Sequence, residues 1–314
     1  MNILLSTDNN YVMPTGVLMT SIGYNNGSDV SYYILVNEEF TNDSRDALAR
    51  VANQFGNKIF FFTITPEMTK DFPFGRADQP THVSIATYYR LFITEVLPAD
   101  VDKILYLDGD MVCRKNLADL WNIDLNGYAV GAVHDCDEVT QTKDNRLPYP
   151  METGYFNAGM LLINLDYWRK NKSYNRFIEC IEKHQNEIVF HDQDVLNICF
   201  WDKKKWLPLS YNFQSSFIHL PEYRTDYSTI ANEIEATKYD PAIIHYVSSS
   251  KPWNVNCFFG YRGAWRYYWR RSQWRSQKLM NDTPHGIKEM LRNFMLRHDL
   301  WFPKSKYQNI ILRK

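Results

Sequence analysis

The clearest signal in this 314-residue chain is the stretch Lys103-Ile104-Leu105-Tyr106-Leu107-Asp108-Gly109-Asp110. Its apolar first half predicts a short buried strand, whose C-terminal end carries two carboxylates separated by one glycine. Aspartate is a poor strand former and is seldom buried unless it is paired or bound to a metal. Two carboxylates this close repel each other unless a cation lies between them, and Mg²⁺ or Mn²⁺ prefers such oxygen ligands. The stretch therefore predicts a divalent-metal site, with a turn carrying two solvated aspartates as the alternative.

Short apolar runs alternate with segments of helical periodicity up to about residue 165. The candidate strands are Asn2–Ser6, Tyr32–Val36, Lys58–Ile64, Lys103–Leu107, Ala129–Val133 and Gly159–Asn164. The candidate helices are Pro14–Tyr24, Asn42–Phe55 and Ser84–Val96, followed by helical patterns over Asp166–Glu187 and from Asp192, whereas 203–240 is irregular. Such alternation predicts an α/β fold with a mostly parallel central sheet covered on both faces. We expect one Rossmann-like catalytic domain over residues 1–258 and a C-terminal tail over 259–314.

Parallel sheets bind ligands at the carboxyl ends of their strands, where this chain places polar residues. Thr7-Asp8-Asn9-Asn10 follows the first strand, and Asp108-Gly109-Asp110 follows the fourth. His245 lies near the end of another short strand, Pro241–Tyr246, and makes a suitable third metal ligand, although a lone histidine there is more often structural. The small residues Ser248–Ser250 let backbone N–H groups approach a phosphate, whose charge Lys251 can neutralise. Together these residues predict a site for a metal-bound diphosphate.

The composition argues against several classes of protein. The five cysteines are scattered and lack any CxxC pair, which argues against a disulfide framework and a zinc site and fits a reducing compartment. No apolar stretch approaches the roughly 20 residues needed to cross a bilayer, and the first residues show no basic leader or cleavage site. We therefore expect a soluble, cytoplasmic protein.

The net charge of −1 conceals an uneven distribution. Residues 251–314 contain 14 Lys and Arg against three acids, whereas the first 250 residues contain 21 against 33. Within the basic part, residues 261–278 combine six basic with six aromatic residues and no acid. At helical spacing Tyr261, Trp265, Tyr268 and Trp269 share one face, which is typical of segments that lie in a bilayer interface.

This basic, aromatic tail predicts peripheral attachment to the anionic inner face of the plasma membrane. Two alternatives are packing against the core of the protein and an oligomer contact. A third is single-stranded nucleic acid, which basic–aromatic interleaving also suits. We expect no nucleic-acid partner, because the body of the protein is acidic.

Six blocks of the sequence, in order, resemble glycosyltransferase family 8, of the bacterial lipopolysaccharide galactosyl/glucosyltransferase type, which also includes glycogenin. The blocks are Asp8-Asn9-Asn10-Tyr11, His82–Arg90, Leu105–Asp110, Phe156-Asn157-Ala158-Gly159, Asp192-Gln193-Asp194 and His245–Trp253. They cover roughly residues 1–260. The resemblance implies a GT-A fold and a retaining transfer of a hexose, galactose or glucose, from a UDP-sugar, with Mn²⁺ or Mg²⁺ bridging the diphosphate. The acceptor it implies is a cell-surface glycan such as lipopolysaccharide or capsule, free or linked to lipid.

The resemblance also implies roles for individual residues. Asp108, Asp110 and His245 match the metal ligands, and Lys251 matches the diphosphate lysine. The residues implied around the nucleotide and its sugar are Thr7, Asp8, Asn10, Tyr11, Arg90, Asp108, Gly109, Asp110, Asn157, Asp192, Gln193, His245, Ser248 and Lys251. Those implied at the reacting sugar are Arg90, Asn157, Asp192 and Gln193, the last below the anomeric carbon.

Several of these residues have a structural alternative. Arg90 could form a helix-surface salt bridge, Asn157 could be a turn residue before a glycine, and Asp192 could cap a helix N-terminus. The sequence also departs from the family at Ser248 and Ser249, where a glycine is common.

The amide of Gln193 is a weak nucleophile, so we favour stabilisation of an oxocarbenium-like state over a covalent intermediate. Two other functions remain open at this point. One is a glycogenin-like self-glucosylating primer, for which any of 21 tyrosines could be the acceptor. The other is a non-enzymatic protein that binds a sugar nucleotide or a membrane. The intact metal ligands disfavour this second possibility.

Overall fold

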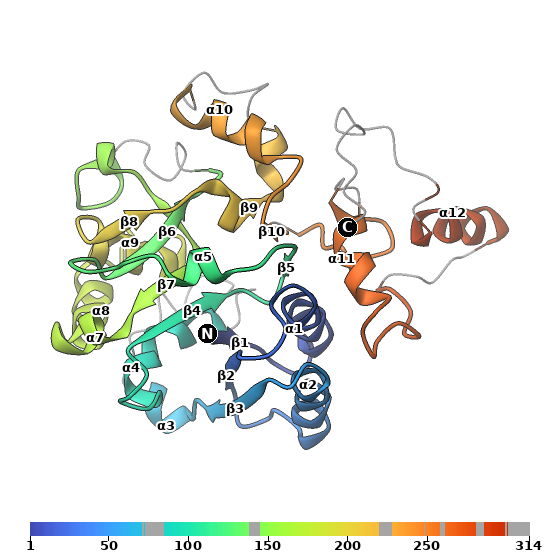
Figure 1. Cartoon of the computed structure of the whole chain (residues 1–314). Coiled ribbons are helices and arrows are strands. Elements are labelled where there is room, and N and C mark those ends of the chain that lie inside the picture. Colours follow the sequence, from blue (N-terminus) through green and yellow to red (C-terminus); the bar gives the residue numbers. More distant parts are fainter. Residues whose placement is uncertain are drawn as a thin grey trace.

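A seven-stranded sheet with the order β3-β2-β1-β4-β7-β6-β8 forms the centre of the molecule in the computed structural model (Figure 1). The described residues are 1–70, 72, 85–137, 145–219, 228–247, 249–257, 261–280, 286–298 and 300. The strands are β1 (Asn2–Ser6), β2 (Ser31–Val36), β3 (Lys58–Thr63), β4 (Lys103–Leu107), β6 (Val130–His134), β7 (Phe156–Asn164) and β8 (Lys204–Trp206). Only β7 runs antiparallel to its neighbours. The predicted α/β fold with a mostly parallel sheet is confirmed.

Helices cover both faces of this sheet, because alternate residues of its strands are apolar on either side. Ile3 and Leu5 of β1 belong to one core with α1 (Val12–Asn26) and α2 (Asn42–Gln54). Leu4 belongs to a second core with α7 (Leu165–Lys170), α8 (Ser173–Lys183) and α9 (His191–Phe200). The smaller helices are α3 (Pro66–Thr69), η1 (Ile85–Phe92), α4 (Ile93–Val96), α5 (Ala118–Trp121), η3 (Met151–Thr153), η4 (Leu209–Asn212), η5 (Ser215–His219) and α10 (Ser228–Thr237).

The structure refines three sequence-based boundaries. β7 begins at Phe156, three residues before the predicted start, because its first residues are buried and pair with β6 beyond an irregularity at Ala132/Val133. The helix predicted to start at Ser84, which lies outside the described residues, is a 3₁₀ helix, η1, that continues into α4. The segment 203–240, predicted as irregular, contains β8, β9 (Phe213–Gln214) and α10.

A second, three-stranded sheet orders the strands β5-β10-β9 and lies beside the carboxyl end of β4. β5 (Met111–Cys113) begins directly after the two aspartates. β10 (Ile243–His245) pairs antiparallel with β5, so that His245 is opposite Met111. This pairing brings a histidine more than 130 residues away in sequence next to the aspartates.

The aromatic stretch after residue 260 packs into the core. α11 (Arg262–Trp269) contacts α1, and Trp265 is fully buried in the same core as Ile3. A Cβ atom added at Gly16 of α1 would lie 2.0 Å from the ring of Trp274, so the tail and α1 are in direct contact. The face predicted to lie in a membrane interface is therefore covered by protein, as in the core-packing alternative. The predicted boundary at residue 258 marks the point where the sequence becomes basic and aromatic, whereas one hydrophobic core includes residues from both sides of it.

A last described helix, α12 (Ile287–Arg297), lies beyond α11 at the edge of the molecule (Figure 1). Its apolar residues are largely exposed, at 74% for Ile287, 55% for Leu291 and 51% for Phe294. Within the described part of the chain, every helix is too short or too polar to span a bilayer.

Candidate active site

Three candidate metal ligands converge at the carboxyl end of β4. Each of Asp108, Asp110 and His245 offers one ligand atom within 4.8 Å of the others. Nε2 of His245 lies 3.2 Å from Oδ1 of Asp110 and 3.9 Å from Oδ2 of Asp108. The backbone N–H of Tyr246 donates to the carbonyl of Asp110 at 3.0 Å, which ties β10 to the end of β4.

The cluster fits a hard divalent cation. It supplies two carboxylates and one imidazole, ligands that suit Mn²⁺ or Mg²⁺. A Cβ atom at Gly159 of β7 would lie 2.4 Å from Cε1 of His245 and 2.8 Å from Oδ2 of Asp108, so glycine is needed for the cluster to form. Burial alone would raise the pKa of Asp110. The neighbouring Lys251 and His245 have a larger, opposite effect, so the pKa of Asp110 is well below its usual range. Asp110 is therefore ionised at neutral pH, as a metal ligand would need to be.

Lys251 lies directly beside this cluster. Its Nζ is 2.6 Å from Oδ2 of Asp110 and donates to the carbonyl of Tyr246 at 2.8 Å. A lysine here can neutralise a phosphate that approaches the metal. The loop residue Ser248, predicted to contact the same diphosphate, lies outside the described residues, as do His82–Ser84 of the second sequence block.

Arg90 is buried and joins two of the predicted site carboxylates, so it is not a helix-surface residue. Its Nη2 donates to Oδ1 of Asp108 at 2.9 Å, and its Nε lies 2.9 Å from Oδ2 of Asp192 in an ion pair without hydrogen-bond geometry. Burial raises the pKa of Asp192 to about 7, although the charge of Arg90 lowers it. Asp192 lies within the first turn of α9, whose N-cap is Phe190, so the alternative role as a helix cap is excluded.

The side-chain amide of Gln193 is held by three hydrogen bonds. Its Oε1 accepts from the backbone N–H of Ala158 at 2.8 Å. Its Nε2 donates to Oδ2 of Asp135 and to the hydroxyl of Tyr155, both at 3.1 Å. Asn157 donates to the same Oδ2 of Asp135 at 2.9 Å. Burial raises the pKa of Asp135, although the hydrogen bonds from Asn157 and Gln193 lower it.

Asp194 follows Gln193 but faces the protein interior. Its carboxylate is fully buried and accepts five hydrogen bonds: two from the guanidinium of Arg146, one from Tyr155, and two from the backbone N–H groups of Val189 and Phe190. A carboxylate has about four lone-pair sites, so none is left for a reacting sugar. Asp194 therefore acts as a structural anchor at the start of α9.

The predicted nucleotide residues lie at the carboxyl end of β1, which is adjacent and parallel to β4. Oδ1 of Asp8 accepts the N–H groups of Asn10 at 2.8 Å and Tyr11 at 3.0 Å, which shapes the turn into α1. Thr7 is buried, whereas Asn10 is exposed. A Cβ at Gly109 would lie 3.2 Å from the Tyr11 ring, so this turn contacts the segment that carries Asp108 and Asp110.

Sequence reasoning missed several residues of this network. Asp135 follows β6, so the rule that selected Asp8 and Asp108 could have found it. No recognisable sequence motif includes Arg146, Tyr155 or Asn212. Each contributes through a partner distant in sequence, as Arg146 does with Asp194 and Asn212 with His245.

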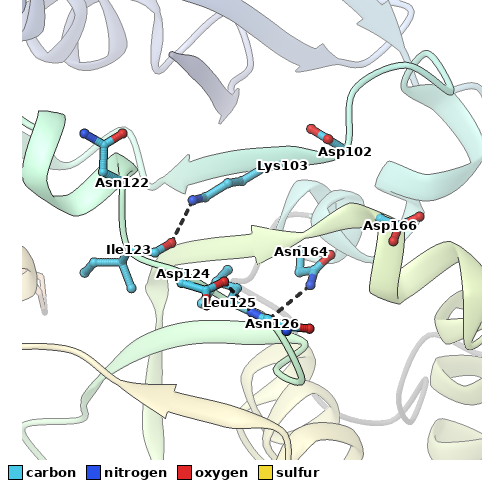
Figure 2. Close-up of a pocket in the computed structure, with 9 residues that line it drawn as sticks. All are labelled: Asp102, Lys103, Asn122, Ile123, Asp124, Leu125, Asn126, Asn164 and Asp166. Carbon is cyan, nitrogen blue, oxygen red and sulfur yellow. Dashed lines mark hydrogen bonds between the residues drawn. The ribbon is translucent and has the colours of Figure 1, made fainter.

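A separate polar cavity of about 550 Å³ lies at the other end of β4 from the aspartate cluster, and Figure 2 shows the residues that line it. It is lined by Lys103 at the start of β4 and by Asn164 at the end of the antiparallel β7, together with the loop 122–126. Nζ of Lys103 donates to the carbonyls of Trp121 at 2.6 Å and Ile123 at 2.8 Å. The cavity and the aspartate cluster are thus at opposite ends of β4.

The chain resembles known glycosyltransferases along most of its length. The model of glycosyl transferase family 8 matches residues 2–257. General stress protein A of Bacillus subtilis (strain 168) is 26% identical over 283 residues, which cover 88% of this chain and 95% of that protein. Lipopolysaccharide 1,2-glucosyltransferase of Escherichia coli (strain K12) is 26% identical over 293 residues, which cover 93% of this chain and 82% of that protein. Glycosyltransferase GlyF of Streptococcus pneumoniae serotype 4 is 32% identical, and the match covers 85% of this chain and 61% of that protein.

A solved structure shares the fold. The galactosyltransferase LgtC, crystallised with donor and acceptor sugar analogs, superposes with a TM-score of 0.76 at 27% identity, covering 87% of this chain and 96% of that one. The sheet, the Asp-Asp-His cluster and the match over residues 2–257 lead to one conclusion: this chain is a glycosyltransferase and belongs to glycosyl transferase family 8.

Proposed function

We propose that this enzyme transfers a hexose, galactose or glucose, from a UDP-sugar to a cell-surface glycan such as lipopolysaccharide or capsule, with retention of configuration. The observation that carries the proposal is the cluster of Asp108, Asp110 and His245 with Lys251 beside it. The names of its relatives support a hexose donor and a lipopolysaccharide acceptor, since they include a 1,2-glucosyltransferase and a 1,3-galactosyltransferase.

In this proposal, the carboxylates and the imidazole hold Mn²⁺ or Mg²⁺, which neutralises charge on the departing diphosphate. Lys251 adds a second positive charge at the same place. Preorganised charge of this kind is usually the largest catalytic contribution. The predicted donor residues Thr7, Asp8, Asn10 and Tyr11 hold the uridine end, where β1 lies beside β4.

At the reacting sugar, Asp192 accepts hydrogen bonds from hydroxyls and Asn157 donates one through its Nδ2, while Arg90 holds Asp192 in place. The neutral amide oxygen of Gln193 is a weak nucleophile and uses one of its two lone pairs to accept the N–H of Ala158, and Asp194 is saturated, so neither favours nucleophilic attack. These contacts support stabilisation of an oxocarbenium-like state. The buried carboxylate of Asp135 adds negative charge next to Gln193.

A donor screen tests this proposal. Purified enzyme is incubated with UDP-galactose, UDP-glucose and other nucleotide sugars, with Mn²⁺ or with EDTA, and UDP release is followed. We expect release from one UDP-hexose, dependent on the metal, and an α-linked product by NMR when an acceptor is supplied. A β-linked product would contradict the retaining mechanism. Intact-mass analysis after incubation distinguishes a self-glucosylating primer, whose mass would rise by whole hexose units.

We further propose peripheral attachment to the inner face of the plasma membrane through α12 rather than α11. Ile287, Met290, Leu291 and Phe294 have the spacing of one helix face, and each is at least half exposed. Lys288, Arg292 and Arg297 are the basic residues of the helix. An amphipathic helix with this composition suits an anionic bilayer surface.

Vesicle co-sedimentation tests the membrane proposal. The double variant Leu291→Asp/Phe294→Asp should lose binding to phosphatidylserine vesicles while UDP release stays unchanged. Tyr239→Ser is a matched control, since Tyr239 is equally exposed, at 55%, but lies next to α10. Binding should also weaken at 1 M salt, where the Debye length is about 3 Å. Equal binding of the double variant and the native protein would rule out α12 as the attachment site.

A further inference from the structure

A chain of hydrogen bonds connects a backbone amide of β7 with the imidazole of His245. The N–H of Gly159 donates to Oδ1 of Asn157 at 3.0 Å. Nδ2 of Asn212 donates to the same Oδ1 at 2.9 Å. Oδ1 of Asn212 then lies 3.0 Å from Nδ1 of His245. All four residues are buried.

The backbone group at the start of this chain fixes the orientation of every side chain after it. A backbone N–H only donates, so the atom of Asn157 that faces Gly159 must be its oxygen. The group of Asn212 that faces this oxygen must then be its NH₂. The oxygen of Asn212 consequently faces His245, and because an amide oxygen only accepts, Nδ1 of His245 must carry a proton.

The opposite nitrogen of the ring faces the carboxylates. Nε2 of His245 lies 3.2 Å from Oδ1 of Asp110 and 3.9 Å from Oδ2 of Asp108. In a neutral histidine protonated at Nδ1, Nε2 carries the free lone pair, which is the form that binds a metal. The hydrogen-bond chain thus selects the tautomer that the proposed metal site requires.

We infer that Asn212 is a positioning residue that sets the tautomer and ring orientation of His245 and links the metal site to the sugar site. The link continues from Asn157, whose Nδ2 donates to Asp135 at 2.9 Å, and from Asp135 to Gln193 at 3.1 Å. The inference rests on the metal site proposed above. Asn212 ends η4, directly before β9, and β9 pairs with β10, so its place relative to His245 is fixed by the small sheet.

Asparagine suits this position better than its closest analogues. In Asn212→Asp, one carboxylate oxygen still accepts from His245. The other oxygen replaces the NH₂ group and cannot donate to Oδ1 of Asn157, so only the hydrogen bond to His245 remains. Leucine has a similar volume and removes both hydrogen bonds. These two variants therefore separate the effect on the metal from the effect on the sugar site.

Nitrogen-15 NMR of the imidazole tests the inference without metal or donor. In metal-free protein with ¹⁵N-labelled histidine, the signal that disappears in His245→Gln belongs to His245. We expect the shift of a protonated Nδ1 for His245 in the native protein. A ring whose Nδ1 carries no proton in the native protein would overturn the inference, even if no variant folds.

Titration of Mn²⁺ in the presence of UDP, followed by the EPR signal of the free ion, provides the second test. We expect Asn212→Leu to lower Mn²⁺ affinity by about 10–100-fold, the usual effect of removing a hydrogen-bond partner of a metal ligand. Asn212→Asp should retain most of this affinity but slow sugar transfer. The control is Asn57→Leu, which removes another buried amide that bonds only to the backbone of Val30 and Gly27 in the interactions described, far from the site.

The outcomes distinguish this inference from the proposed function. Native Mn²⁺ affinity in folded Asn212→Leu would overturn the role of Asn212 but leave the metal site intact. If the native protein itself binds no Mn²⁺ with UDP, the metal assignment fails instead. Equal losses in Asn212→Leu and Asn57→Leu would show a general loss of stability and would also overturn the inference.

Discussion

The hydroxyl of Tyr155 lies 3.1 Å from Nε2 of Gln193 and donates its own proton to Asp194 at 2.8 Å. Because the hydroxyl of Tyr155 donates its hydrogen bond to Asp194, its oxygen can only accept from Gln193. This arrangement fixes which end of the Gln193 amide faces Tyr155 and which faces Ala158. The orientation of a residue predicted to lie below the reacting carbon thus depends on the neighbouring carboxylate.

Tyr155→Phe tests that dependence. Loss of one hydrogen bond to Gln193 should slow sugar transfer by about 10-fold, close to the 1–1.5 kcal/mol of one buried hydrogen bond, with little change in the KM of the donor. Steady-state kinetics with the donor found in the screen measure both values. Tyr149→Phe is the matched control, because Tyr149 is also buried and packs with Tyr155 but bonds to the carbonyl of Gly154. Equal effects of the two variants would contradict the prediction.

Asp110→Asn should lower turnover by about 100-fold or more, because it removes a charged metal ligand and the partner of Lys251. Native activity should disappear in EDTA and return with Mn²⁺. The control is Asp119→Asn, an exposed aspartate of α5 that should have no effect. A thermal melt establishes that each variant is folded. Full activity of the native enzyme in EDTA would exclude the metal site.

The pH dependence of stability should report on Asp192. Its pKa is about 7 in the folded protein against 3.8 for the ordinary carboxyl, so the folded state holds a proton that the unfolded chain releases. The stability from this group is fully present below pH 3.8 and is lost as the pH rises through about 7. In metal-free buffer, the Tm of Asp192→Asn relative to the native protein should therefore increase from pH 5 to pH 8. A constant difference across this range would contradict the assignment.

Trp265→Ala should destabilise the protein by about 3–5 kcal/mol, because the indole is fully buried between the tail and the body. Chemical denaturation measures the change in unfolding free energy. Arg275→Ala, an exposed position in the same segment, should change it by less than about 0.5 kcal/mol. A negligible effect of Trp265→Ala would show that the tail folds independently of the body. Truncation before Tyr261 is expected to unfold the enzyme for the same reason.

Local pattern was enough to predict the sheet and the end of it at which the Asp108–Asp110 cluster lies. The short apolar run before Asp108 favours a buried strand, and a carboxylate directly after such a strand lies at a carboxyl end. The same rule placed Asp8 correctly at the end of β1. Asn157 and Gln193 were identified by resemblance, since neither follows from periodicity.

Tertiary structure alone decided the remaining features. Helical spacing shows that Trp265 and Trp269 share an apolar face, but the same spacing fits a bilayer and a protein core, and only the contact with α1 distinguishes them. Asn212 lies in a segment without periodicity, and its function exists only because β9 pairs with β10. Short-range patterns encode which residues avoid water, whereas the partner that covers or orients each residue is set by contacts between segments distant in sequence.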